Sequence, residues 1–193
     1  RIRAACAQGP KSAADLVPVL FTRELDPHQM SFAFTETLAH ANRLPILMLC
    51  GDTFIPRLPD PVLQQMENFN DPTFGVNDAF KSVSRYWDRI ERPEQLMVAV
   101  LNAMRVLTDP VETGAATLCL PQDTQAEAYD YPDYFLAKRI WHIDRRPLNP
   151  RSLHEAATLL SKAKKPLIIA GGGVHYSQAA DTLRDFAETF GIP

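Results

Sequence analysis

Apolar and polar positions alternate along this chain in blocks that predict helices followed by buried strands. Leu44–Cys50 is a continuous apolar run, which is typical of a strand covered on both faces in a parallel sheet. Pro93–Leu107 carries apolar side chains at helical spacing, and the apolar run Ala116–Leu120 follows it. This alternation of helix and strand has a parallel sheet as its natural product. The pattern therefore predicts an α/β fold.

Weaker signals lie around these elements. Asp26 and Pro27 can cap and open a helix whose apolar positions continue to Ala41. Asp60-Pro61 predicts a short helix that ends near Glu67, whereas residues 80–87 are ambiguous between strand and loop. Residues 1–25 give no clear pattern.

A second block begins after a proline-rich stretch. Asn149 can cap a helix that Pro150 opens, and Pro166–Ala170 reads as the next strand. Ser177 is expected to cap a further helix that stops at Gly191. Residues 151–193 would supply one strand and two helices, which is too little to bury a stable core, so we expect a domain that is cut short.

Composition narrows the classes of function. The chain has 193 residues, of which 46% are hydrophobic and 22% charged, as expected of a globular protein. A formal net charge of −3 disfavours a nucleic-acid partner. The sequence has neither an apolar run of roughly 20 residues that could cross a membrane nor a signal peptide. Cys6, Cys50 and Cys119 form no CxxC pair, so we expect inert thiols in a reducing cytoplasm.

Gly171, Gly172 and Gly173 are the best candidate for a binding site, because they follow an apolar run directly. Glycines allow a ligand to approach the backbone closely, and free N–H groups suit phosphates. The spacing is neither GxGxxG nor a P-loop, however. On spacing alone, a tight turn between strand and helix is the better interpretation.

Other candidates are weaker. Asp52 and Asp123 each follow a predicted strand, and we expect both to cap the next turn or helix rather than to act in catalysis. Trp141-His142 lies among arginines in the linker. We interpret this pair as an aromatic residue that packs against a domain with solvated charges around it, rather than as an anion pocket or a general base. The five histidines have no paired ligand spacing, so no metal site is predicted.

Six stretches of the chain carry a resemblance to a known family. They are AHANRLPILMLCGDTF, RLPDPVLQQMENF, VNDAFKSVSRYWDRIERPEQL, AMRVLTDP, LCLPQDTQAEAYDYP and AKKPLIIAGGGVHYS. Together they resemble the thiamine-diphosphate enzymes of the acetolactate-synthase type, and more narrowly the trihydroxycyclohexanedione hydrolases of myo-inositol catabolism.

The resemblance implies a division into domains. Residues 1–125 would be the C-terminal part of a pyrimidine-binding domain, with residues 1–30 matching poorly. Residues 126–150 would be the interdomain linker, and residues 151–193 the start of a Rossmann-like central domain, cut short. In flavin-containing relatives the glycine loop of the central domain lies near FAD, which the hydrolases are not expected to need.

The resemblance also implies a reaction, in which a thiamine ylid attacks a carbonyl and a C–C bond of a small cyclic dione is hydrolysed. The cofactors would be thiamine diphosphate and Mg²⁺, in a cytoplasmic homo-oligomer. The family's catalytic glutamate, its GPGATN-like loop and its metal motif are not found in this sequence. We therefore assign no catalytic and no metal residue, and expect a fragment that is inactive and binds no cofactor alone. The alternatives are an acetolactate-synthase-like lyase fragment and a non-catalytic α/β binding module.

Overall fold

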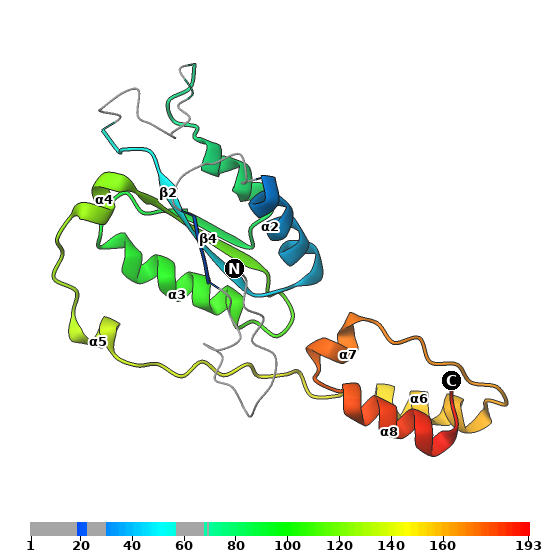
Figure 1. Cartoon of the computed structure of the whole chain (residues 1–193). Helices are drawn as coiled ribbons and strands as arrows, with labels where there is room; N and C mark the ends of the chain where they lie inside the picture. The colour runs from blue at the N-terminus through cyan, green and yellow to red at the C-terminus, as the bar shows by residue number, and fades with distance from the viewer. Residues whose placement is uncertain (1–18, 23–29, 57–67, 69) are drawn as a thin grey trace. The chain divides into compact units, whose positions relative to one another are not determined.

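The computed structural model describes residues 19–22, 30–56, 68 and 70–193 (Figure 1). The sheet-forming part contains the strands and helices β1 (Val19–Thr22), α2 (Met30–Asn42), β2 (Ile46–Asp52), η2 (a 3₁₀ helix, Val76–Ser82), β3 (Tyr86–Arg89), α3 (Gln95–Leu107) and β4 (Ala115–Pro121). It is followed by α4 (Gln122–Ala126), α5 (Asp133–Leu136), α6 (Pro150–Lys162), α7 (Gly172–Tyr176) and α8 (Ala180–Phe190).

The four described strands form one parallel sheet in the order β1-β2-β4-β3. The chain moves from β1 to β2 in one direction across the sheet and from β3 to β4 in the other. Because crossovers between parallel strands are right-handed, the two connecting helices are expected on opposite faces. Figure 1 shows α2 on one side of the sheet and α3 on the other. The predicted α/β class with a parallel, three-layer domain is confirmed.

The two faces of the sheet carry different cores. Toward α2 and η2, a buried cluster contains Met48, Cys50 and Cys119, with Trp87 packed against it. Toward α3, the clusters contain Ile90, Ala99, Leu118, Ala103, Leu107 and Ala116. The predicted buried runs of β2 and β4 thus have apolar neighbours on both faces, as a parallel sheet requires.

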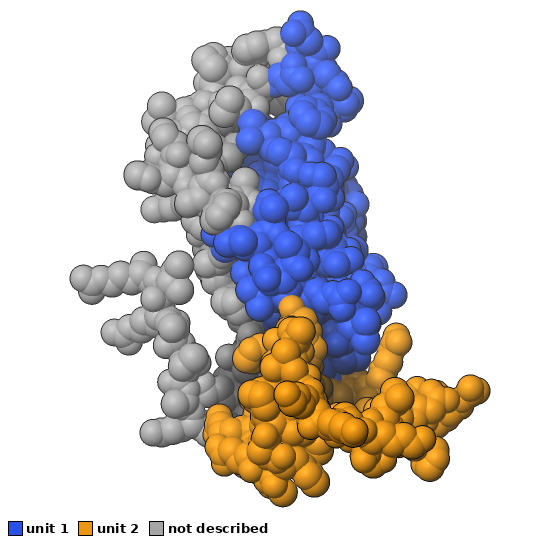
Figure 2. Space-filling view, turned by 90° about the vertical axis from the view of Figure 1, so that its right-hand side faces the viewer, with its two compact units in different colours: residues 1–143 blue, residues 144–193 orange. Residues whose placement is uncertain are grey.

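The chain divides into two compact units, residues 1–143 and 144–193, which Figure 2 shows in separate colours. In the second unit Asn149 caps α6 as predicted, since its side chain accepts a hydrogen bond from the N–H of Arg151 at 3.0 Å. Gly191 ends α8 with a left-handed φ of 60°. No residue of 144–193 is buried, so this unit has no core of its own.

Two predicted features of the second unit are wrong. Pro166–Ala170 is extended but is no strand, because no strand lies beside it within the unit; Ile168 N–H instead donates to the carbonyl of Pro193 at 2.9 Å. Its side chains Leu167 and Ile169 are 69% and 89% exposed. Ser177 does not cap α8 but is the C-cap residue of α7. Gln178, which follows it, has a left-handed φ of 55° and separates the two helices.

Predictions at the edges of the first unit had mixed outcomes. α3 begins two residues after the predicted Pro93, and the ambiguous stretch 80–87 is divided between the end of η2 and the start of β3. The predicted start of the first helix at Asp26-Pro27 and the predicted helix from Asp60 to Glu67 lie outside the described residues.

Candidate functional site

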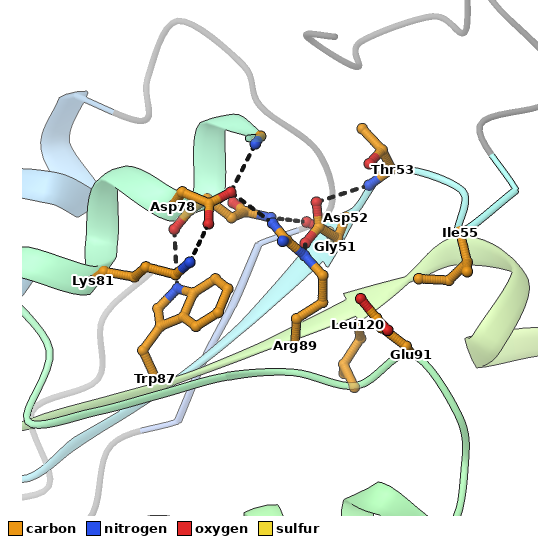
Figure 3. Close-up of polar contacts among 12 residues, drawn as sticks. Gly51, Asp52, Thr53, Ile55, Asp78, Lys81, Trp87, Arg89, Glu91 and Leu120 are labelled. Atoms are coloured by element: carbon orange, nitrogen blue, oxygen red, sulfur yellow. Dashed lines mark hydrogen bonds and ion pairs between the residues drawn. The ribbon is translucent and has the colours of Figure 1, made fainter. Parts of the chain in front are cut away.

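A cluster of charged side chains lies at the carboxyl edge of the sheet, where ligands gather in open α/β folds (Figure 3). β2 ends at Asp52 and β3 ends at Arg89, with β4 between them. The register pairs both Cys50 and Arg89 with Cys119 of β4. Since side chains alternate between faces, Cys50, Asp52 and Arg89 all lie on the face toward η2.

Arg89 joins two buried carboxylates across the end of β4. Its Nε lies 2.6 Å from Asp52 Oδ2 and its Nη2 lies 2.9 Å from Asp78 Oδ2. The side chains of Asp52 and Asp78 are 3% and 2% exposed, and that of Arg89 is 19% exposed. A guanidinium suits this position because its planar fork can serve two acceptors at once.

The 3₁₀ helix η2 supplies the other half of the cluster. Asp78 accepts a hydrogen bond from the N–H of Gly75 at 2.7 Å and pairs with Lys81 Nζ at 2.5 Å. Lys81 lies 4.3 Å from the centre of the Trp87 ring, within the range of a cation–π contact. The Trp87 indole N–H donates to the carbonyl of Asn77 at 3.0 Å. The helix is thereby tied to β3 at several points.

The electrostatics of the cluster are balanced, with two carboxylates facing two cations. Burial by itself raises the pKa of Asp78, but hydrogen bonds from Lys81, Arg89 and the Gly75 N–H outweigh it, so that the pKa is lowered. Burial opposes the charge of Arg89, yet Asp78 and Asp52 raise its pKa. A carboxylate held ionised and fully paired is a poor general base. The cluster therefore acts as a clamp between η2 and the sheet.

Asp52 and Asp123 both bind backbone, as expected of residues after strands. Asp52 Oδ1 accepts from the N–H of Thr53 at 2.9 Å, which is the predicted cap of the next turn. Asp123 differs from its prediction, because it caps neither the next turn nor a helix. Its carboxylate accepts from the N–H of Ile55, 68 residues earlier, at 3.1 and 3.3 Å. It therefore links the loop after β2 to the end of β4.

The linker and the glycine loop hold the remaining candidates. Trp141 is half-buried and His142 is exposed. Gly171, Gly172 and Gly173 are all exposed, and a Cβ added at Gly171 or Gly173 would have nothing within 4 Å. Gly171 has a φ of −103°, which other residues adopt freely. Among the described residues, neither packing nor a positive φ explains the glycines at 171 and 173.

Two of the three cysteines are placed as predicted. Cys50 and Cys119 are free thiols that lie opposite each other on β2 and β4, 2% and 0% exposed. A hydrogen bond with Cys50, together with burial, raises the pKa of Cys119. Thiols of this kind are unreactive, because the thiolate is the nucleophile. Cys6 lies outside the described residues.

The acidic side chains of the described residues are not gathered into a set of metal ligands. Those residues contain no group of three His, Cys, Asp or Glu side chains that could hold a metal ion. Asp52, Asp78 and Asp123 are already bound to cations or to backbone N–H groups. In the same part of the chain, no helix has the length and apolar character needed to cross a membrane.

Comparison with known proteins places the chain beside one class of enzyme. Residues 153–193 match the family model of the thiamine pyrophosphate enzyme central domain. Residues 1–47 match a different model, the metallo-beta-lactamase-like C-terminal domain. In the structure, the described part of that range forms β1, α2 and the first residues of β2. The resemblance to the thiamine-diphosphate enzymes is confirmed. Thiamine diphosphate is the cofactor of that class of enzyme.

The particular relatives are hydrolases. The chain is 52% identical over 172 residues to the 3D-(3,5/4)-trihydroxycyclohexane-1,2-dione hydrolase of Clostridium tetani, which covers 89% of this chain. The proteins of the same name from Bacillus cereus and Bacillus thuringiensis are also 52% identical over 172 residues. The chain spans 27% of the length of these curated relatives.

Proposed function

We propose that this chain is part of a thiamine-diphosphate-dependent hydrolase that cleaves a C–C bond of a trihydroxycyclohexane-1,2-dione in inositol catabolism. The observation that carries the proposal is the 52% identity over 89% of the chain to enzymes of that name. Within the longer enzyme, residues 1–125 would be the C-terminal part of the pyrimidine-binding domain and residues 126–150 the linker. Residues 151–193 would begin the central domain, in agreement with the family match at 153–193.

The role that we propose for the described residues is to shape the enzyme rather than to react. The carboxylates at the sheet edge are engaged in structural contacts: Asp52 and Asp78 with Arg89, and Asp123 with the Ile55 N–H. An activating acid must be free to bind the reacting group, so none of these three suits that role. The catalytic acid and the metal ligands would come from other parts of the longer enzyme.

Gly171, Gly172 and Gly173 are our candidate for the point where this chain approaches a cofactor. These glycines are exposed, and none of the described residues fills the space where side chains would stand at Gly171 and Gly173. An approaching ligand or a further part of the enzyme could use that space. Replacing the glycine that corresponds to Gly173 by Val in a complete hydrolase would then weaken cofactor binding, whereas replacing an exposed alanine of α6 by Val would not.

We place the enzyme in the cytoplasm as a homo-oligomer acting on a small molecule. Free, buried thiols at Cys50 and Cys119 suit a reducing compartment, because neighbouring cysteines in an oxidising one are prone to disulfide formation.

Calorimetric titration of the purified chain tests the proposed division of labour. With Mg²⁺ present, thiamine diphosphate is expected to give no binding heat, and the chain is expected to open no cyclic dione. A complete hydrolase measured in parallel serves as the positive control. Tight, Mg²⁺-dependent binding of thiamine diphosphate by the chain alone would contradict the proposal that the chain is non-catalytic by itself. Turnover of pyruvate instead of the dione by the complete enzyme would favour the lyase alternative.

A further inference from the structure

A carboxyl group is buried between α2 and the middle of the sheet, apart from the charged cluster at the edge. Glu36 of α2 is 0% exposed and faces Thr117 of β4, which is also 0% exposed. β4 is a central strand, so this position lies well inside the first unit. An acidic side chain with no exposure is rare unless it is paired with a cation or neutralised.

The two oxygens of Glu36 have different surroundings. Oε1 accepts hydrogen bonds from Thr117 Oγ1 and Ser84 Oγ, both at 2.5 Å. The Ser84 hydroxyl also lies 2.8 Å from the carbonyl of Phe80 and 2.8 Å from Thr117 Oγ1, and either hydroxyl can be the donor in the second of these contacts. Oε2 is buried and has no hydrogen-bond partner among the described residues. A carboxylate would leave one of its charged oxygens unsatisfied there.

The Arg and Lys side chains on the described elements around Glu36 are already paired. Among the described residues, the titratable and charged side chains that share this face of the sheet or the helices over it are His40 on α2, Cys50 and Asp52 on β2, Cys119 on β4, Arg89 on β3, and Asp78 and Lys81 on η2. Arg89 is bound to Asp52 and Asp78, and Lys81 is bound to Asp78. A hydrogen bond with Cys50, together with burial, raises the pKa of Cys119. A charge on Glu36 would therefore lie in the core without an Arg or Lys partner among the described residues.

A second unpaired atom lies on the same side of α2. Nδ1 of His40 is buried without a hydrogen-bond partner among the described residues, and positions 36 and 40 share one helix face. A proton on Glu36 Oε2 would put a donor on the face that carries this nitrogen.

We propose that the folded chain carries Glu36 as a neutral carboxylic acid and that this acid is a pH-sensitive latch between α2 and β4. Oε1 accepts the two hydroxyl hydrogen bonds and Oε2 keeps the proton. Burial raises the pKa of Glu36 more than the hydrogen bonds from Ser84 and Thr117 lower it. The unfolded chain loses the proton at a lower pH than the folded chain, so the latch is complete in acid and weakens as the pH rises toward the raised pKa.

Urea unfolding of the whole chain, followed by far-UV circular dichroism from about pH 5 to about pH 8, tests the latch. Relative to Glu36→Gln, which cannot ionise, the unfolding constant of the wild type is expected to rise about tenfold per pH unit until the raised pKa is reached. Glu127→Gln is the matched control, because Glu127 is exposed, and it should follow the wild type. Parallel pH dependences for the wild type and Glu36→Gln would overturn the proposal.

Infrared difference spectroscopy gives a second readout that does not need a stable variant. In the folded wild type at a pH just above the ordinary value for glutamate, the C=O stretch of a protonated carboxylic acid should be present, and it should vanish on unfolding in urea. Glu36→Gln should lack that band while Glu127→Gln keeps it. A folded wild type with carboxylate bands only, at a pH just above the ordinary value for glutamate, would also overturn the proposal.

Discussion

Replacing Arg89 by Met tests whether the charged cluster is a structural clamp. The substitution keeps much of the aliphatic stem but removes the ion pairs of 2.6 Å to Asp52 and 2.9 Å to Asp78. It leaves two carboxylates, 3% and 2% exposed, without that cation. Breaking a buried ion pair by removing one partner costs about 3–5 kcal/mol.

The expected cost for Arg89→Met is at the lower end of that range, about 3 kcal/mol. Asp78 keeps Lys81 and the Gly75 N–H, and Asp52 keeps the Thr53 N–H. The Arg89 side chain is 19% exposed, so water already screens part of its charge. Each of these contacts limits the penalty of the unpaired carboxylates without removing it.

Urea unfolding at neutral pH measures this cost in the whole chain. The matched control is Arg92→Met, because Arg92 pairs with Glu94 at 2.7 Å but is 70% exposed, and such exposed pairs contribute little to stability. Adding Asp52→Asn and Asp78→Asn to Arg89→Met should recover part of the loss, since the buried charges are then gone. If Arg89→Met costs no more than Arg92→Met, the clamp does not hold the fold together.

Acid and thiol chemistry provide two further checks. The pKa of Asp78 is lowered in the folded chain, so the stability that its carboxylate contributes is present above the ordinary pKa and is lost as the pH falls through the lowered value. The urea midpoint should therefore drop in acid less steeply for Asp78→Asn than for the wild type. Equal slopes for the two proteins would contradict this. In a Cys6→Ser background, Cys50 and Cys119 should resist iodoacetamide in the folded chain and react in urea, as mass spectrometry can measure. Rapid labelling of Cys119 without urea would show that the strand pair is open.

The strands that could be predicted from sequence are those whose two faces are both covered. Leu44–Cys50 and Ala116–Leu120 are continuous apolar runs, and they correspond to β2 and β4 with shifts of only a few residues at the ends. Pro166–Ala170 has the same composition but is no strand, because a strand also needs a neighbour and a local pattern contains no information about one. Composition predicts where a strand can form and pairing decides whether it does.

The charged cluster was harder to predict because its members are distant in sequence. Asp52 could be expected to cap a turn, since that contact is with the next residue. Its pairing with Arg89 spans 37 residues and depends on the strand order, which places β4 between them. The burial of Glu36 could not be predicted from the local sequence, in which Glu36 is an acidic residue next to the apolar positions of a predicted helix. Its burial follows from the packing of α2 over Thr117, which no local pattern specifies.

Exchange of the matching segment with a complete hydrolase tests the central claim most directly. The 172 residues of this chain that align with the Clostridium tetani enzyme would replace their counterparts there, and cleavage of trihydroxycyclohexane-1,2-dione would be measured with thiamine diphosphate and Mg²⁺. The proposal predicts a chimera that folds, binds the cofactor and opens the dione, because the segment supplies the same scaffold. A folded chimera that binds the cofactor but leaves the dione intact, or that consumes pyruvate instead, would contradict it.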